Sequence, residues 1–318
     1  MTDEWKIRSF GSLDLDSGKI NNNADTIDAK GEASTNSVRS GGAANAVAAP
    51  INKYVARMTT DRYAKEYNMN HKHRGQALIF NHEHFTIPYL STRRGTNVDS
   101  EQLTKALERL GFEVSVHKDC ILSEILNVVS KAAAKDHTDN DCIVIAVMSH
   151  GEHGHLYAKD VQYRLDSIWT YFTANNCPTL AGKPKLFFIQ ACQGDKLDPG
   201  TTMVKETETD GDSSTSYKIP THADFLFSYS TIPGYFSWRN TDNGSWYIQS
   251  LIKELNENGK EYNMLTLLTF VSQRVAVDYE SNVPSNPLMD RQKQIPCVTS
   301  MLTRILRFND KPPYSQAG

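Results

Sequence analysis

Apolar residues in this chain fall into short continuous runs separated by segments of helical spacing. Residues 142–148 and 185–189 form the most apolar runs, and each is bounded by polar turn residues. Such runs predict strands that are buried on both faces of a sheet. Further strands are expected at residues 76–81, 112–116 and 223–230 and within residues 295–308.

The segments between these strands carry apolar residues at every third or fourth position, as amphipathic helices do. In residues 99–110 these positions are Leu103, Ala106, Leu107 and Leu110. Other helices are expected at residues 121–132, 166–172, 243–258 and 262–276. The repeated strand–helix–strand order predicts an α/β fold with helices on both faces of a mainly parallel central sheet.

Composition narrows the class of protein. The chain has 318 residues, 39% hydrophobic and 22% charged, enough for one large α/β domain or two small ones. A net charge of −3 argues against nucleic acid as the main partner. No apolar run reaches the roughly 18 residues of a membrane-spanning helix, and residues 1–6 lack the apolar core of a secretory signal.

Five scattered cysteines argue against disulfides. No C-x-x-C pair occurs, so neither a disulfide framework nor a zinc ribbon is expected, and a reducing cytoplasmic location fits best. The cysteines are Cys120, Cys142, Cys177, Cys192 and Cys297.

Two histidine groups invite comparison with metal sites. His82 and His84 would point in opposite directions on an extended segment, so we interpret residues 82–84 as a polar loop. The spacing of His150, His153 and His155 could also indicate a metal site, but this pattern is weak, and we favour a catalytic role for His150. We expect neither a metal nor another cofactor.

Two segments are rich in polar and small residues. Residues 1–50 and 198–219 contain too few large apolar side chains to offset the entropy of ordering, so we expect both to be disordered. A polar loop as long as the second one inside a folded domain is usually functional.

Two of the buried strands lead into reactive side chains. His150 follows the run at 142–148, and Cys192 follows the run at 185–189, 42 positions later. Because the carboxyl ends of parallel strands meet at one edge of a sheet, these side chains can come together. A core cysteine is the common alternative, but polar neighbours such as Gln190 and Gln193 argue against it.

The cysteine lies in a specific motif. Gln190-Ala191-Cys192-Gln193-Gly194 matches the Q-A-C-[RQG]-G signature of caspases, and Ser149-His150-Gly151 lies upstream. Over residues 57–310 the chain resembles the caspase family, and more closely its insect effector members. The resemblance implies an aspartate-specific cysteine endopeptidase of the executioner type, which is made as a zymogen and acts in apoptotic proteolysis.

The resemblance also assigns catalytic roles. Cys192 is the expected nucleophile and His150 its base, since a thiol near neutral pH needs an imidazole to become nucleophilic. The backbone N–H groups of Gly151 and Cys192 are the expected donors to the oxyanion.

Substrate recognition is assigned in the same way. Arg93, Arg239 and Gln190 match the groups that bind the aspartate before the cleaved bond (P1), with Arg94 as the rival of Arg93. Phe236 and Trp238 match the apolar wall of the next subsite. Asn240 and Trp246 match positions that hold an acidic P4 residue in effector members. Together they imply a preference for Asp-x-x-Asp.

Processing sites follow from the resemblance as well. It implies a pro-segment at residues 1–28, a large subunit at 29–210 and a small subunit at 211–318, with cleavage after Asp28 and Asp210. The active form would be a homodimer of large/small heterodimers, paired through the strand near residues 295–302. An upstream initiator caspase would cut the zymogen, and Ala29 would become an anchor for inhibitor-of-apoptosis proteins.

Two other functions compete with this interpretation. A catalytically inactive caspase-like binding protein would lack the nucleophile or the arginines, whereas this chain carries Cys192, His150, Arg93 and Arg239. A different thiol enzyme, either a Cys hydrolase or a redox protein, is the second alternative. A redox role would need a resolving cysteine near Cys192, and the nearest upstream, Cys177, lies across an expected helix–turn boundary.

Overall fold

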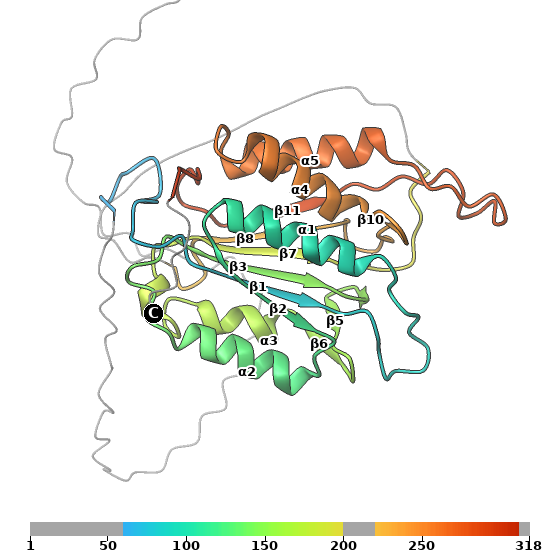
Figure 1. Cartoon of the computed structure of the whole chain (residues 1–318), viewed down its shortest axis with the longest axis horizontal. Coiled ribbons are helices and arrows are strands. Elements are labelled where there is room, and N and C mark those ends of the chain that lie inside the picture. The colour runs from blue at the N-terminus through green and yellow to red at the C-terminus, as the bar shows by residue number, and fades with distance from the viewer. Residues whose placement is uncertain (1–59, 200–219, 312–318) are drawn as a thin grey trace, which may run out of the picture. The chain divides into compact units, whose positions relative to one another are not determined.

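A six-stranded sheet forms the centre of the protein, which we describe from a computed structural model over residues 60–199 and 220–311 (Figure 1). The strands are β1 (Gln76–Asn81), β2 (Glu113–Lys118), β3 (Ile143–Met148), β7 (Lys185–Gln190), β8 (Phe225–Tyr229) and β11 (Cys297–Ser300). They lie in the order β11-β8-β7-β3-β1-β2, and every neighbouring pair is parallel except β11 with β8. The predicted mainly parallel sheet is therefore confirmed.

Helices cover both faces of this sheet (Figure 1). One face carries α1 (Thr96–Arg109), α4 (Trp246–Asn258) and α5 (Met264–Asp278). The other carries α2 (Leu122–Ala133), α3 (Asp166–Trp169) and the 3₁₀ turns η1 (Thr170–Phe172) and η2 (Pro178–Leu180). Among the helices of residues 60–199 and 220–311, none has the combined length and hydropathy of a membrane span.

The two helical layers explain the continuous apolar runs of the sequence. Along β1, Ala77 and Ile79 join the core under α1, whereas Leu78 and Phe80 join the core under α2. Successive side chains of a strand point to opposite faces, so a strand covered on both sides needs apolar residues at every position. Every residue of β1, β3 and β7 is buried accordingly.

Five short strands were not predicted. They are β4 (Gly151–Glu152), β5 (His155–Tyr157), β6 (Gln162–Arg164), β9 (Arg239–Asn240) and β10 (Gly244–Ser245). The helix expected from residue 243 begins at Trp246 instead, because Gly244 has a φ of +90° and Ser245 is extended. Such two- and three-residue strands lack a periodic pattern that a sequence could reveal.

A buried histidine lies just beyond the end of β1. The His82 side chain is fully buried, and its Nε2 lies 3.1 Å from the Cys120 carbonyl oxygen, so Nε2 carries the proton. Nδ1 has no partner among the described residues. Burial lowers the pKa of His82 to about 4, and the charge of Arg93 acts in the same direction.

We expect this histidine to make stability depend on pH. The unfolded chain binds a proton on His82 near pH 6.5, but the folded protein binds it only near pH 4. The free energy of unfolding should therefore fall by about 3 kcal/mol as the pH drops through this window. Denaturant unfolding from pH 7 downward measures it.

The control is a nearby exposed histidine, His84. The pH dependence should become weaker in His82→Gln and stay unchanged in His84→Gln. Equal slopes in wild type and His82→Gln would show that His82 is not the titrating group.

Candidate active site

Two neighbouring strands end in the side chains that the sequence singled out. The parallel register pairs Met148 of β3 with Gln190 of β7, and the Ser149 N–H extends the pairing to the Gln190 carbonyl at 3.1 Å. His150 and Cys192 each lie two residues beyond that pair. The structure thus brings both residues to the same edge of the sheet.

Glycine at position 151 allows the two strand ends to approach closely. A Cβ there would lie 2.7 Å from the Cys192 carbonyl oxygen and 2.8 Å from the Ala191 Cβ. The His150 carbonyl accepts the Tyr157 N–H of β5 at 3.1 Å, so by strand alternation the Gly151 N–H points away from β5. The Cys192 N–H has no acceptor among the described residues. Both N–H groups are therefore available to a reacting carbonyl oxygen.

A backbone carbonyl sets the tautomer of His150. Its Nε2 lies 2.7 Å from the Ser91 carbonyl oxygen, which can only accept a hydrogen bond, so Nε2 carries the proton and Nδ1 keeps a lone pair. The Phe85 ring packs against the imidazole with centroids 4.9 Å apart. Burial lowers the pKa of His150, and the charges of Arg93 and Arg239 act in the same direction. The neutral imidazole is a base ready to accept a proton at Nδ1.

The Cys192 thiol is partly buried against residue 237. The Ser237 N–H donates to Sγ at 3.4 Å, and Sγ lies 3.7 Å from the Ser237 carbonyl oxygen. Burial raises the pKa of the thiol, while the Ser237 N–H and the charges of Arg93 and Arg239 offset part of that rise. A raised thiol pKa and a lowered imidazole pKa favour the uncharged pair before substrate binds.

Arg93 is buried beside the thiol with unused donors. Its side chain is only 1% exposed, and Nη1 donates to the His82 carbonyl at 2.8 Å and to Thr96 Oγ1 at 2.9 Å. Its Nε and Nη2 have no partner among the described residues. Burial and the neighbouring Arg239 lower the pKa of Arg93 to about 9. An unpaired buried cation is costly, so this group is built to receive an anion.

Arg239 reaches the same place from the other half of the chain. Its Nε donates to the Arg94 carbonyl oxygen at 2.8 Å, whereas the Arg94 side chain is exposed. Gly95, with a φ of +86°, permits this contact, because a Cβ there would lie 2.5 Å from the Asn240 carbonyl oxygen. The geometry therefore separates Arg93, which is buried near the thiol, from its rival Arg94.

Gln190 completes the group of polar side chains. It is 2% exposed, its Nε2 donates to Ser237 Oγ at 2.8 Å, and its Oε1 has no partner among the described residues. A hydroxyl can donate as well as accept, so rotating the amide would keep the Ser237 contact and expose an N–H donor instead. Gln190 can thus join the arginines in binding an anion.

A buried carboxylate in the first turn of α1, that of Asp99, partly balances these charges. Asp99 accepts hydrogen bonds from the Ser245 N–H and hydroxyl at 2.8–3.0 Å and from Gln249 Nε2 at 2.9 Å. Burial raises its pKa, and its negative charge favours the protonated forms of Arg93 and Arg239. Asp99 therefore ties α1 to α4 and stabilises the arginine pair without pairing with it directly.

Aromatic residues lie on both sides of Ser237, the residue that contacts the thiol, and in the helix that follows. Trp238 stacks on Trp246 with centroids 5.8 Å apart, and Trp246 stacks on Tyr279 at 5.4 Å. Trp246 is only 7% exposed and joins the core, whereas Phe236 and Trp238 are half-buried. Phe236 and Trp238 are thus accessible to a ligand, and Trp246 supports Trp238 from below.

Asn240 is the exposed last residue of β9 and precedes a turn. Its Oδ1 accepts the N–H groups of Asp242 at 2.8 Å and Asn243 at 2.9 Å. These bonds hold the turn together, so the amide oxygen is already engaged and only the NH₂ group stays open to a ligand.

The loop after the cysteine is bound to the segment around residue 234. The Gln193 N–H donates to the Tyr235 carbonyl at 3.0 Å, and Gly234 N–H donates to the Gln193 carbonyl at 2.7 Å. A Cβ on Gly194 would lie 2.5 Å from the Gly234 carbonyl oxygen. Residues on either side of the segment 200–219 therefore build one site.

The structure offers no support for a metal in the described ranges. No group of three His, Cys, Asp or Glu side chains there could hold an ion. All five cysteines are free thiols. Asp28, Ala29 and Asp210 lie outside the described residues, as do nearly all positions of the two segments expected to be disordered.

Comparison with known proteins identifies the family. A model of the Caspase domain family matches residues 74–307. Caspase-1 of Drosophila melanogaster is 67% identical over the whole of both chains. Caspase drICE of the same species is 64% identical over 84% of this chain and 80% of its own.

A solved structure agrees with these relatives. The crystal structure of Caspase-1 from Spodoptera frugiperda shares 59% identity and superposes with a TM-score of 0.76, covering 81% of this chain and all of that one. The family match spans β1 to β11, His150, Cys192 and both arginines. The chain therefore belongs to the caspase family of aspartate-specific cysteine endopeptidases.

Proposed function

We propose that this executioner-type caspase cleaves peptide bonds after aspartate with Cys192 as nucleophile and His150 as base. The relatives support the activity, and one observation of this chain supports the residue roles. Arg93 presents two unpaired N–H-bearing nitrogens at a buried position, near enough to Arg239 and the Cys192 thiol for their charges to interact, and we propose this place as the P1 pocket. A substrate carboxylate in that pocket would pair both cations and hold the next carbonyl over the sulfur.

The proposed reaction uses the tautomer set by Ser91. The Cys192 thiol proton passes to His150 Nδ1 as Sγ attacks the carbonyl carbon of the P1 aspartate. The Gly151 and Cys192 N–H groups stabilise the oxyanion. The intermediate collapses to a thioester as the C–N bond breaks, and His150 gives its proton to the leaving amine. Water, deprotonated by His150, then hydrolyses the thioester and restores the thiol.

Specificity in this account comes from paired charge. A guanidinium binds a carboxylate through two parallel N–H···O bonds, and the neutral Asn side chain cannot replace that interaction. Phe236 and Trp238 supply apolar contacts for the P2 side chain. Asn240 and Trp246 are proposed to shape the P4 subsite for an acidic residue, Asn240 through its NH₂ group and Trp246 through its support of Trp238.

Zymogen processing is proposed at two aspartates. Cleavage after Asp210 would divide the chain into the large and small subunits, and removal of residues 1–28 would expose Ala29. The two parts would stay joined through the parallel pairing of β7 with β8 and the bonds between the loops at 193 and 234–235. N-terminal sequencing of the mature subunits tests both cuts. The large subunit should begin at Ala29 and the small subunit at Gly211.

Partners are proposed on the same basis. Strand β11 forms one outer edge of the sheet, and its Thr299 and Ser300 are exposed, which supports pairing with a second copy.

An initiator caspase is the proposed activator, and inhibitor-of-apoptosis proteins are proposed to bind Ala29. The free thiols support a reducing, cytoplasmic location. Analytical ultracentrifugation of the processed protein tests the proposed dimer, which should sediment with the mass of two large/small pairs.

Hydrolysis of fluorogenic tetrapeptides tests the proposed activity. Protein cut after Asp210 should cleave Asp-Glu-Val-Asp much faster than analogues ending in Glu or Asn, and Cys192→Ala should abolish the reaction. Equal rates for Asp and Asn would contradict the charged pocket. No cleavage by correctly cut protein would favour an inactive binding protein with the caspase fold.

The two neighbouring arginines provide a matched pair of variants. We expect Arg93→Met to reduce kcat/KM for the tetrapeptide by about a thousandfold, because loss of a buried charge pair is worth about 4 kcal/mol. Arg94→Met should stay within about threefold of wild type, since only its backbone carbonyl contacts Arg239. A larger loss in Arg94→Met than in Arg93→Met would reverse the assignment.

A further inference from the structure

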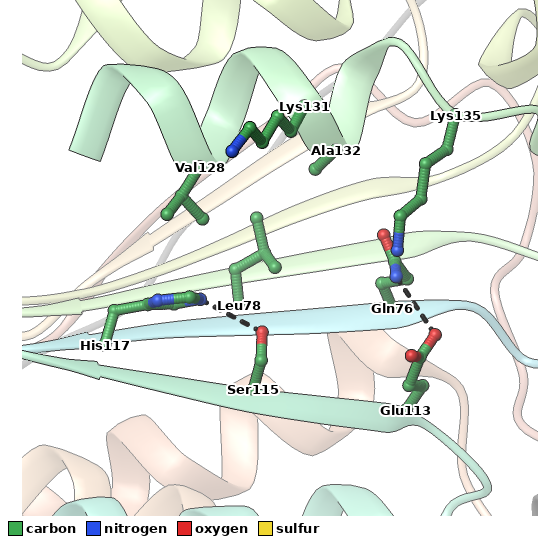
Figure 2. Close-up of a pocket in the computed structure, with 9 residues that line it drawn as sticks. All are labelled: Gln76, Leu78, Glu113, Ser115, His117, Val128, Lys131, Ala132 and Lys135. Atoms are coloured by element: carbon green, nitrogen blue, oxygen red, sulfur yellow. Dashed lines mark hydrogen bonds between the residues drawn. The ribbon is translucent and has the colours of Figure 1, made fainter. Parts of the chain in front are cut away.

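A groove lies at the opposite side of the sheet from β11, between strand β2 and helix α2. Figure 2 shows its lining, with Gln76 and Leu78 on β1, residues of β2 below, and residues of α2 above. Glu113, Ser115 and His117 of β2 face α2 but are only half-buried, because the helix leaves this margin of the sheet uncovered. The cavity measures about 270 Å³. Strands β1 and β3 separate it from the Cys192-bearing strand end.

Strand β2 also has an open edge. It is the last strand of the sheet, and the Glu113 N–H donates to the Gly75 carbonyl at 3.0 Å. In a parallel ladder alternate residues face the neighbour, so residues 113, 115 and 117 bond to β1, and the peptide groups of Val114 and Val116 point outward. No described residue pairs with them. An edge of this kind accepts an added strand.

The floor and rim of the groove have distinct chemistry. The interior of the groove is apolar and is lined by Leu78 from the sheet and by Val128 and Ala132 from α2. At one end the buried Gln76 donates to Glu113 at 3.0 Å, and its Oε1 has no partner among the described residues. This end therefore lacks a hydrogen-bond donor that a ligand could supply.

Two lysines give the rim its charge. Lys131 and Lys135 line the groove, and within the described residues neither has a carboxylate within 4.0 Å. Three other exposed lysines are paired, Lys105 with Glu101, Lys118 with Glu83 and Lys260 with Asp310. Lys65, Lys72, Lys196 and Lys253 are exposed and, like the two groove lysines, have no ion pair among the described residues. Glu113 is the one acid lining the groove, and the Gln76 amide already engages it. The unpaired charge at this rim is positive.

We propose that β2 and α2 form a docking groove for an extended, acidic segment of a partner protein. The segment would pair with the outward peptide groups of Val114 and Val116 as a seventh strand. Its side chains alternate in direction, so every second one would enter the groove, where carboxylates meet Lys131 and Lys135. A protein that docks here would be held by the enzyme at a site remote from the bond that is cut.

A defined peptide tests this groove directly. The probe is fluorescein-labelled Glu-Val-Glu-Val-Glu-Val, added to the full chain, with Lys-Val-Lys-Val-Lys-Val as the charge-reversed control. Fluorescence polarisation should show saturable binding of the acidic peptide with a Kd below about 1 mM, and no comparable binding of the basic one. Absence of saturable binding, or equal binding of both peptides, would overturn the proposal.

Two kinds of variant separate charge from strand pairing. The double variant Lys131→Glu/Lys135→Glu should weaken binding at least about tenfold. Val116→Pro should do the same, because proline has no N–H and is tolerated at an outward edge position, whereas Val116→Thr should bind like wild type. Loss in the lysine variant with full binding in Val116→Pro would mean a general anion contact, such as with a polyanion, and would overturn strand addition.

Hydrogen exchange keeps the test independent of how the proline variant folds. In wild-type protein the acidic peptide should slow exchange of the outward amides of Val114 and Val116 at least about tenfold. Unchanged exchange there with bound peptide would also overturn strand addition. The variants should hydrolyse the tetrapeptide at the wild-type rate, since the groove lies apart from the catalytic strand ends.

Discussion

The parallel pairing of β3 with β7 is the constraint on which the site depends. It sets Met148 beside Gln190, so the residues that follow the two strands must leave the sheet together. Glycine at 151 then allows the two segments to approach closely, since a Cβ there would lie only 2.7 Å from the Cys192 carbonyl oxygen. The segments that carry the imidazole and the thiol therefore lie side by side. A slip of one residue in either strand would turn His150 or Cys192 to the other face.

Electrostatics around this junction connects binding to chemistry. The charge of Arg239 helps to lower the pKa of Arg93, and the charges of both arginines oppose protonation of His150. The negative charge of Asp99 offsets part of this repulsion without contacting either arginine. Hydrogen bonds from Ser245 and Gln249 hold the Asp99 carboxylate in place. We expect a P1 carboxylate to neutralise the pocket and so to raise the proton affinity of His150 when it must accept the thiol proton. Selective binding and base strength would then have one origin.

Much of this could be predicted from the sequence, and the rest could not for physical reasons. The buried runs at 142–148 and 185–189 gave β3 and β7, because burial on both faces demands apolar residues throughout. The motif around Cys192 led to the family, which the comparisons confirm. The role of Ser91 rests on a backbone carbonyl, which any residue carries. Asp99 reads as an ordinary helix-end acid until α4 is placed against it, and the groove beside β2 depends on how far α2 reaches across the sheet.

Covalent capture tests the central claim, that Cys192 attacks a carbonyl held by an aspartate in the arginine pocket. Processed protein would be treated with tetrapeptide chloromethyl ketones ending in Asp or in Asn, and the modified residue would be identified by peptide mass mapping. We expect a single adduct on Cys192, formed with the Asp reagent at a rate far above that of the Asn reagent. An adduct on another of the five cysteines, or equal rates for the two reagents, would contradict it.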